Sequence, residues 1–393
     1  MPAYSVEAKS EVRKPYTLPS TPPADCPFPA SSEIRGVSFT GRWATYTQAD
    51  TWYPSWGRDG EMVSAFTDGV GENWGTARSG CGVESVIGVG RIDGDDPMAL
   101  TIHDLGRVPG SALPYGGRYP CGALNHEGIW YQGTYALQDA AQPNKFNWPV
   151  LQGFLGFHVS KDGGVTWELS PHNGDTPMFG EHREPLDQPL KIGVPHFVDF
   201  GRNMEHSPDG YAYLVTQGAS QGGPDRRKNF LSWINADEAY LARVRPGLET
   251  MNDPAAYEFF VGQGQWSSKL GEARPIAAWP ENMGCVTITY NAPLKKYLML
   301  VTDGTITIKD FNTYLLESDS ITGPWRMVSY WEKFGPTGYF FNIPSKFISA
   351  DGKTFWMCYS ANFDDAEGRM NPLVGNPVGS SYSMVLLECT LNL

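Results

Sequence analysis

The chain has 393 residues, of which 41% are hydrophobic and 19% are charged, and its formal net charge is −13. This balance is typical of a globular protein, and the excess of acidic residues argues against nucleic acid as a partner, since nucleic-acid binders display basic surfaces. No apolar run is long enough to cross a membrane and no signal peptide is visible, so we expect a cytoplasmic protein or a secreted one whose signal has been removed.

A hairpin recurs five times along the chain. Each copy has a strand, a tight turn that usually contains Asp-Gly, and a second strand rich in aromatic and β-branched residues. The copies lie at residues 50–69, 121–137, 203–219, 284–304 and 343–362. A further pair of strands follows each of the first four copies, whereas a single strand at 383–391 follows the fifth.

A spare strand at residues 35–40 is available to complete the fifth sheet. Repeats of four strands, with one blade shared between the two ends of the chain, predict an all-β fold, the five-bladed β-propeller. We therefore expect four-stranded blades, with the last blade closed by the N-terminal strand. Residues 1–34 are predicted to be an N-terminal extension, and residues 35–393 a single propeller domain.

The connections between the predicted strands differ in length, which indicates the functional face. In a propeller blade, the links between strands one and two and between strands three and four share one face, and the other links share the opposite face. The first set is short here, whereas the second set is long, as at residues 69–82 and 170–194. Long connections build binding sites more often than tight turns do, so we expect the site on their face.

Two aspartates of the first repeat are the leading catalytic candidates. Asp50 opens strand one and Asp68 ends strand two, so adjacent antiparallel strands bring both to the face of the long connections. Aspartates in the tight turns, such as Asp59 and Asp209, are interpreted as turn formers. For Asp68 the alternative is that it only ends a strand, because the same Thr-Asp-Gly triplet recurs at Asp303.

Further polar side chains are predicted at the same end from equivalent places in the other blades. They supply the amide, guanidinium, hydroxyl and carboxylate groups that sugar hydroxyls require. These candidate substrate-binding residues are Arg118, Tyr135, Arg202, Asn203, Gln217, Asn282, Asp303 and Asn342. Trp52, Trp56 and Trp74 are candidates for stacking on sugar rings, with core packing as the alternative for each.

Histidine and cysteine offer a different chemistry. His196 and His206 lie close to the predicted inner strand of blade three and could orient a carboxylate or bind a metal, with a structural role as the alternative. The six cysteines are scattered and are expected to be buried free thiols. No metal-binding spacing, P-loop or dinucleotide fingerprint is present, so no cofactor is predicted, although the central channel leaves room for a structural cation.

The stretches Ala-Asp-Thr-Trp-Tyr-Pro-Ser-Trp at 49–56 and Phe-Thr-Asp-Gly at 66–69 resemble the first blade of five-bladed glycoside hydrolases. The likeness is to the DUF4185 group, which includes endo-D-arabinanases of glycoside hydrolase family 183, and more broadly to arabinanase-like propellers. It implies an oligo- or polysaccharide substrate that contains arabinofuranose or a related sugar. It also implies that Asp50 and Asp68 are the essential pair. A glutamate from a later blade is implied to be the general acid, and Glu205 is the best placed for this role.

Glycoside hydrolysis needs two carboxyl groups across the scissile bond. Asp50 is expected to be ionised and to act as nucleophile or as base for water. Asp68 or Glu205 is expected to be kept protonated by apolar neighbours and to protonate the leaving oxygen.

Two other functions stay open at this stage. The first is a polysaccharide lyase that acts on uronate-containing glycans through a histidine, a tyrosine and an arginine. Its candidate residues are His196 or His206, Tyr135, and Arg118 or Arg202. The second is a noncatalytic glycan-binding propeller.

Overall fold

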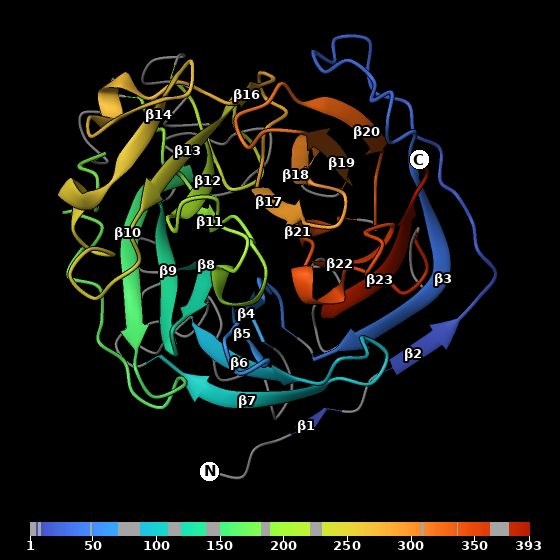
Figure 1. Ribbon diagram of the computed structural model, residues 1–393, viewed down its shortest axis with the longest axis horizontal. Helices are drawn as coiled ribbons and strands as arrows, with labels where there is room; N and C mark the ends of the chain where they lie inside the picture. The colour runs from blue at the N-terminus through green and yellow to red at the C-terminus, as the bar shows by residue number, and fades with distance from the viewer. Residues whose placement is uncertain are drawn as a thin grey trace.

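Five antiparallel sheets surround a central axis in the computed structural model of the chain (Figure 1). The structure describes residues 5–6, 9–47, 49–69, 87–108, 119–138, 150–181, 189–220, 230–307, 310–335, 337–361 and 377–393. Every named element in these ranges is a β-strand or a short 3-10 helix. The prediction of an all-β, five-bladed β-propeller is therefore confirmed.

The blades follow one another along the chain. Blade 1 contains β4 (Ser55–Trp56), β5 (Met62–Phe66), β6 (Gly88–Asp93) and β7 (Thr101–Arg107). Blade 2 contains β8 (Tyr119–His126), β9 (Ile129–Gln138) and β10 (Val150–Ser160). Blade 3 contains β11 (His196–Phe197), β12 (Ala212–Gly218), β13 (Glu238–Val244), β14 (Glu258–Gly262), β15 (Gln265–Ser267) and the paired β16 (Ala277–Ala278).

Blades 4 and 5 complete the ring. Blade 4 contains β17 (Val286–Asn291), β18 (Lys296–Thr307), β19 (Asp310–Ser318) and β20 (Arg326–Trp331). Blade 5 contains β21 (Tyr339–Asn342), β22 (Thr354–Ser360), β23 (Met384–Leu391), β3 (Val37–Tyr46) and β2 (Lys9–Val12). The short 3-10 helices are η2 (Arg202–Met204), η3 (Pro254–Ala256), η4 (Leu270–Glu272) and η5 (Ser345–Phe347).

The predicted count of four strands per blade holds for blade 4, and the other blades depart from it. Blade 1 gains an edge strand, because β1 (Ser5–Val6) pairs with β7. In blade 2 the place of a fourth strand is taken by an isolated bridge between Val159 and Glu168. These differences affect the outer edges of the blades and leave the inner strands, which line the channel, in the predicted order.

The last blade is closed by the N-terminal strand, as predicted. Strand β23 pairs with β3 over a register that runs from Met384 opposite Tyr46 to Leu391 opposite Val37. The preceding segment also packs on the propeller, since the Ser31 hydroxyl donates to Glu317 at 2.9 Å and Glu33 lies 2.8 Å from the Lys296 ammonium. The described residues before β3 therefore run along the outside of blades 1, 5 and 4 (Figure 1).

Tight turns join the first two strands of blades 1, 2 and 4 at one end of the channel, whereas longer connections that carry η2 and η5 join them in blades 3 and 5. Between β8 and β9 the turn has only two residues, Glu127 and Gly128, with φ of 51° and 78°. Positive φ at both positions is the requirement of a type I′ hairpin, which suits the twist of the strands. We call this end of the channel the short-turn end and the opposite one the long-connection end.

Inner strands of neighbouring blades are joined directly around the channel. The Gly122 amide donates to the Pro195 carbonyl at 3.1 Å between blades 2 and 3, and the Tyr290 amide donates to the Asp199 carbonyl at 2.9 Å between blades 3 and 4. Side chains make the remaining three links. These are Thr287 Oγ1 to the Phe341 carbonyl (2.7 Å), Asn342 Nδ2 to the Trp52 carbonyl (2.8 Å), and the Asn125 amide to Ser55 Oγ (2.9 Å).

Candidate active site

Asp50 and Asp68 lie together at the long-connection end of the channel. The backbone of Asp50 forms an antiparallel bridge with Thr67, with N···O distances of 3.1 and 3.0 Å. Asp68 follows directly and has a φ of 48°, a left-handed conformation that aspartate adopts more readily than most residues. The predicted placement of the two carboxyl groups on adjacent strands of blade 1 is therefore what the structure shows.

Blade 5 supplies hydroxyl groups to this pair. Tyr339, the first residue of β21, donates to Asp50 Oδ2 at 2.8 Å, while Thr51 donates to Asp50 Oδ1 at 2.7 Å. Tyr382, just before β23, donates to the Asp68 carbonyl at 2.8 Å and also hydrogen-bonds the Asp50 carboxyl. We call these five residues the Asp50 cluster. The cluster spans the junction between the first and the last blade.

The surroundings of Asp50 favour its neutral form. Its side chain is buried, and this burial, with the nearby charge of Asp68, raises its pKa to about 7. The hydroxyl groups of Thr51, Tyr339 and Tyr382 oppose the rise, because they donate to the ionised form. Burial also raises the pKa of both tyrosines well above 10, so they stay protonated and remain donors. Asp50 can therefore take up and release a proton near neutral pH.

Aromatic rings enclose the cluster on the channel side. Trp233 packs against Tyr339 and Phe340, with ring centroids 5.6 and 4.8 Å apart, and all three side chains are buried. The Gln217 side chain donates to the Trp233 carbonyl at 3.4 Å. An apolar wall of this kind excludes water and so disfavours charge on a neighbouring carboxyl group.

A buried trio, formed by Tyr53, His196 and Cys285, fills the middle of the channel. The Tyr53 and His196 rings lie 3.9 Å apart, and Cys285 Sγ is 3.3 Å from both the Tyr53 hydroxyl and His196 Nε2. Burial raises the pKa of the Cys285 thiol to about 12 and lowers that of His196 to about 3. Both groups are therefore neutral at pH 7, which is the opposite of an activated thiolate–imidazolium pair. Tyr135 is buried nearby, close enough to Asp50 and Cys285 for their charges to affect it.

Four predicted site residues lie at the opposite end from Asp50. Arg202 donates to the carbonyl of Arg58, which belongs to the tight turn of blade 1. Asn203 bonds to Glu127 in the tight turn of blade 2, and its own neighbours Glu205 and His206 are 3.9 Å apart on the same surface. The expectation that these residues share an end with Asp50 is wrong.

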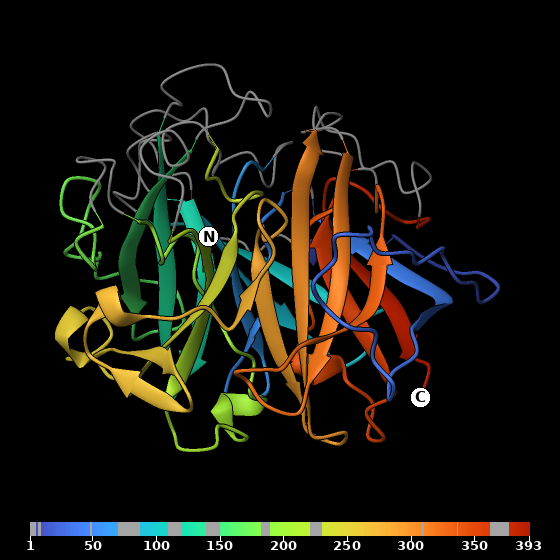
Figure 2. The ribbon, with the colours of Figure 1, turned by 90° about the horizontal axis from the view of Figure 1, so that it is seen from above.

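The displacement has a simple cause in blade 3. Its inner strand is β11, which has only two residues and precedes the predicted start at Asn203. The chain then turns through Gly201, with a φ of 87°, into η2 at the short-turn end (Figure 2). The polar residues that were expected to open the strand therefore follow it.

Two tryptophans that were expected to stack on sugar are placed elsewhere. Trp52 is fully buried in blade 1, where its ring stacks on Phe66 at 5.2 Å and its indole N–H donates to the Ala49 carbonyl. Trp56 lies in β4, toward the short-turn end. Core packing is therefore the role that the structure gives Trp52.

The remaining candidates are distributed over blades 4 and 5. Asn342 lies at the end of β21, three residues beyond Tyr339, and so reaches the middle of the channel. Asp303 is buried inside blade 4 and accepts a hydrogen bond from the Tyr330 hydroxyl at 3.3 Å. Asn282 lies in a turn before β17, where its amide donates to the Pro280 carbonyl. Trp74 and Arg118 lie outside the described residues.

Sequence reasoning missed Tyr339 and Tyr382. Both lie beside strands that were correctly recognised, but the inner strand of blade 5 was predicted to begin near Asn342 instead of Tyr339. The available sequence signal was the aromatic run Tyr-Phe-Phe at 339–341, because aromatic residues favour strands. All four residues of β21 are buried. Tyr382 had no distinctive local pattern, and only the closure of the ring brings it to Asp68.

The structure shows few groups that suit a metal ion. Within the described ranges, no set of three or more His, Cys, Asp or Glu side chains could hold one. The described cysteines are Cys26, Cys121, Cys285, Cys358 and Cys389, and all five are free thiols. Among the residues that the structure describes, no helix is long and apolar enough to cross a membrane.

No protein-family model matches the chain, and no curated protein sequence does. Among solved structures, the chain is similar to a GH43_1 enzyme from Xanthomonas citri, with 15% identity over 87% of each chain and a TM-score of 0.46. It is similar to the catalytic domain of a GH62 α-L-arabinofuranosidase from Coprinopsis cinerea, with 10% identity, 99% and 97% coverage and a TM-score of 0.43. It is also similar to a protein of unknown function from Dyadobacter fermentans, with 12% identity, 98% and 99% coverage and a TM-score of 0.43. Similarity at this level assigns no activity, and the resemblance to the DUF4185 group stays a prediction.

Proposed function

We propose that the protein is a glycoside hydrolase whose reacting carboxyl groups are Asp50 and Asp68. One observation carries this proposal. Two carboxyl groups from adjacent strands lie together at the long-connection end of the channel, where one of them is buried and holds a proton near neutral pH. Glycosidic bonds are commonly cleaved by a pair of carboxyl groups whose surroundings give them different pKa values. The substrate class that we propose is an oligo- or polysaccharide with arabinofuranose or a related sugar.

The environment of the pair supports a division of roles opposite to the one expected from sequence. Asp50 has the raised pKa, so it is the group that carries a proton at mildly acidic pH and can protonate the leaving oxygen. Asp68 is then the partner that acts as nucleophile or as base for water. The hydroxyl groups of Tyr339 and Thr51 fix the orientation of the Asp50 carboxyl through both of its oxygens.

The geometry gives less support to a lyase. Two of its candidate residues, His206 and Arg202, lie at the short-turn end, whereas Tyr135 lies beside the Asp50 cluster. His196 is buried in the channel against Tyr53. Glu205, the other candidate acid, lies beside His206 and Arg202 at the short-turn end, whereas Asp50 lies at the long-connection end.

The test uses wild type, Asp50→Asn and Asp68→Asn on a panel of arabinans, arabinogalactans and uronate-bearing gums. Reducing ends and ultraviolet absorbance are followed together, and circular dichroism confirms that each variant is folded. We expect wild type to release saturated sugars and both variants to lose at least about a thousandfold in rate, as expected when a reacting group is removed.

Each other outcome identifies a rival. Unsaturated product that persists in Asp50→Asn would show lyase chemistry at another site. Binding of glycans without turnover, retained in both variants, would show a noncatalytic glycan-binding protein.

A further inference from the structure

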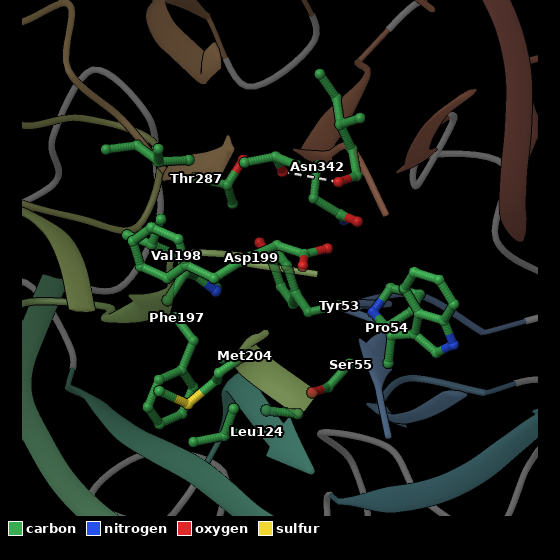
Figure 3. Close-up of a pocket in the computed structure, with 18 of the residues that line it drawn as sticks. Tyr53, Pro54, Ser55, Leu124, Phe197, Val198, Asp199, Met204, Thr287 and Asn342 are labelled. Atoms are coloured by element: carbon green, nitrogen blue, oxygen red, sulfur yellow. Dashed lines mark hydrogen bonds between the residues drawn. The ribbon is translucent and has the colours of Figure 1, made fainter. Parts of the chain in front are cut away.

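The channel contains a cavity on the short-turn side of the buried Tyr53, His196 and Cys285 trio. All five inner strands contribute to its wall, and its empty volume, counted together with open solvent at its mouth, is about 560 Å³. Figure 3 shows it between Tyr53, Pro54 and Ser55 on one side and Val198 on the other. Neither Asp50 nor Asp68 lines this space. The cavity is therefore separate from the candidate active site.

Polar atoms of three side chains are available in this cavity. Asn342 commits its amide hydrogens to the Trp52 and Phe340 carbonyls at 2.8 and 3.1 Å, which leaves its Oδ1 as the atom it can offer a ligand. Asp199 is held by the Ser345 amide on Oδ2 at 2.7 Å, and this oxygen can accept one more hydrogen bond. Figure 3 shows both side chains pointing into the cavity.

His196 contributes an atom that the protein leaves unsatisfied. Its side chain is 2% exposed and lines the cavity, and its Nδ1 has no hydrogen-bond partner among the described residues. A buried polar atom without a partner is costly and is usually satisfied by water or a ligand. Burial lowers the pKa of His196 to about 3, so the ring is neutral and leaves one nitrogen as an acceptor.

The wall near the mouth is built with a strained backbone. Met204 lines the cavity with a φ of 61°, a left-handed conformation that is rare for a bulky residue, and Asn203 beside it has a φ of 53°. Hydrogen bonds between Asn203 and Glu127, at 2.8 and 2.6 Å, hold this segment in place. Local strain of this kind persists only when the surrounding structure imposes it, and it gathers at ligand sites.

The lining selects a class of ligand. The Asp199 carboxylate disfavours an anion, and the described part of the chain has no set of three acidic, His or Cys side chains for a metal ion. A wholly apolar ligand would leave the polar atoms of Asn342 and His196 unpaired. The other walls, which include Leu124, Val198 and Ile288, are apolar. A molecule with several hydroxyl groups on a compact carbon skeleton matches both kinds of surface.

We propose that this cavity is a second binding site, for a small neutral polyol no larger than a single sugar ring. The site does not depend on the proposed hydrolysis, because it lies on the other side of the buried trio from the Asp50 cluster. Ligand hydroxyl groups donate to Asn342 Oδ1, Asp199 Oδ2 and His196 Nδ1.

The experiment titrates the protein with glycerol, L-arabinose and D-xylose at millimolar concentrations and measures binding by calorimetry and ligand-observed NMR. Wild type, Asp50→Asn, Asn342→Leu and Thr287→Val are compared. Thr287→Val is the matched control, since Thr287 lines the same cavity but its hydroxyl already donates to the Phe341 carbonyl. Crystals of the wild type soaked in each probe show where it binds.

We expect Asn342→Leu to weaken binding about tenfold, as the loss of a buried hydrogen-bond acceptor implies, while Asp50→Asn and Thr287→Val bind as wild type does. Density for the probe should lie against Asn342 and Asp199. The proposal fails if soaked crystals hold only water in the cavity, or if Asn342→Leu binds as tightly as Thr287→Val. Should Asn342→Leu not fold, the wild-type crystals decide alone. Loss of hydrolysis in Asp50→Asn bears on the active site only.

Discussion

The two ends of the channel hold the same kinds of side chain in different environments. At the long-connection end, Asp50 is buried and its carboxyl oxygens accept hydrogen bonds from hydroxyl groups. At the short-turn end, Glu205 is half exposed beside His206, and Glu127 pairs with Arg58 in water. Burial disfavours the charged form of a carboxyl group, and this shifts Asp50 toward its neutral form. The environment of a carboxyl group, and not its residue type, therefore determines whether it can exchange a proton near neutral pH.

The sharpest test of this contrast is to remove one carboxylate from each end. Asp50→Asn should lower hydrolysis at least about a thousandfold, and Glu205→Gln should leave it within about twofold, because only Asp50 lies in the proposed site. Initial rates on the best glycan substrate measure both. Equal losses of hydrolysis rate in the two variants would contradict the assignment of the reacting acid to the buried Asp50.

Stability at alkaline pH should change next most strongly. In the folded protein Asp50 keeps its proton up to pH about 7, against an ordinary value of 3.8 that applies in the unfolded chain. The folded state therefore binds more protons between these values, and its stability falls as pH rises through this range. Asp50→Asn has no such loss, so it should be more stable than wild type by about 2–4 kcal/mol at pH 8.

Urea denaturation at pH 8 and at pH 4 measures this effect. The difference between Asp50→Asn and wild type should shrink at pH 4, where Asp50 is protonated in the folded state. A variant that is less stable than wild type at pH 8 would contradict the raised pKa.

The hydroxyl of Tyr339 allows a finer adjustment of the same carboxyl group. Tyr339→Phe removes a donor that favours ionised Asp50, so the pKa of Asp50 should rise by up to about one unit. Carbon-13 NMR of the Asp50 carboxyl measures the shift directly, and the alkaline limb of activity should move to higher pH with it. Tyr257→Phe is the control, because that buried hydroxyl donates to the Met251 carbonyl and has no contact with Asp50. An unchanged titration in Tyr339→Phe would rule out this role.

The smallest effect is expected at the short-turn end. Arg58 and Glu127 are 3.1 Å apart with more than half of each side chain exposed. Exposed ion pairs contribute little, so Arg58→Ala should change the free energy of unfolding by no more than about 0.5 kcal/mol. Thermal unfolding at two salt concentrations checks this. A loss several times larger would show that the turn supports the channel mouth.

The sequence predicts the ring better than it predicts the site. Alternating strands and regular turns identify five blades and the closing strand, because each signal is local and repeats. The pairing of Asp50 with Asp68 follows from neighbouring strands of one hairpin, so it is also predictable. Tyr339 and Tyr382 reach these residues only across the closure of the ring, and no local pattern reports a contact over so many residues.

An error in the predicted position of one strand explains most of the misplaced residues. The inner strand of blade 3 is two residues long. A strand this short has no alternation of apolar and polar residues, so the sequence pattern points to the turn after it instead. The result moved Arg202, Asn203, Glu205 and His206 to the wrong end of the channel. Trp52 was misplaced for another reason, since side-chain direction on an irregular stretch cannot be read from alternation.

Ring closure by the N-terminal strand also means that the newly made chain cannot complete blade 5 until β23 has been synthesised. Strand β3 is made well before its partner β23, because β4 to β22 lie between them in the chain. At ordinary rates of synthesis the wait is roughly half a minute, during which β3 can pair with β2 on one edge but has no partner on the other. An unpaired strand edge can associate with other chains. The edge of β3 that β23 later covers is therefore open to association for as long as the chain between the two strands is being made.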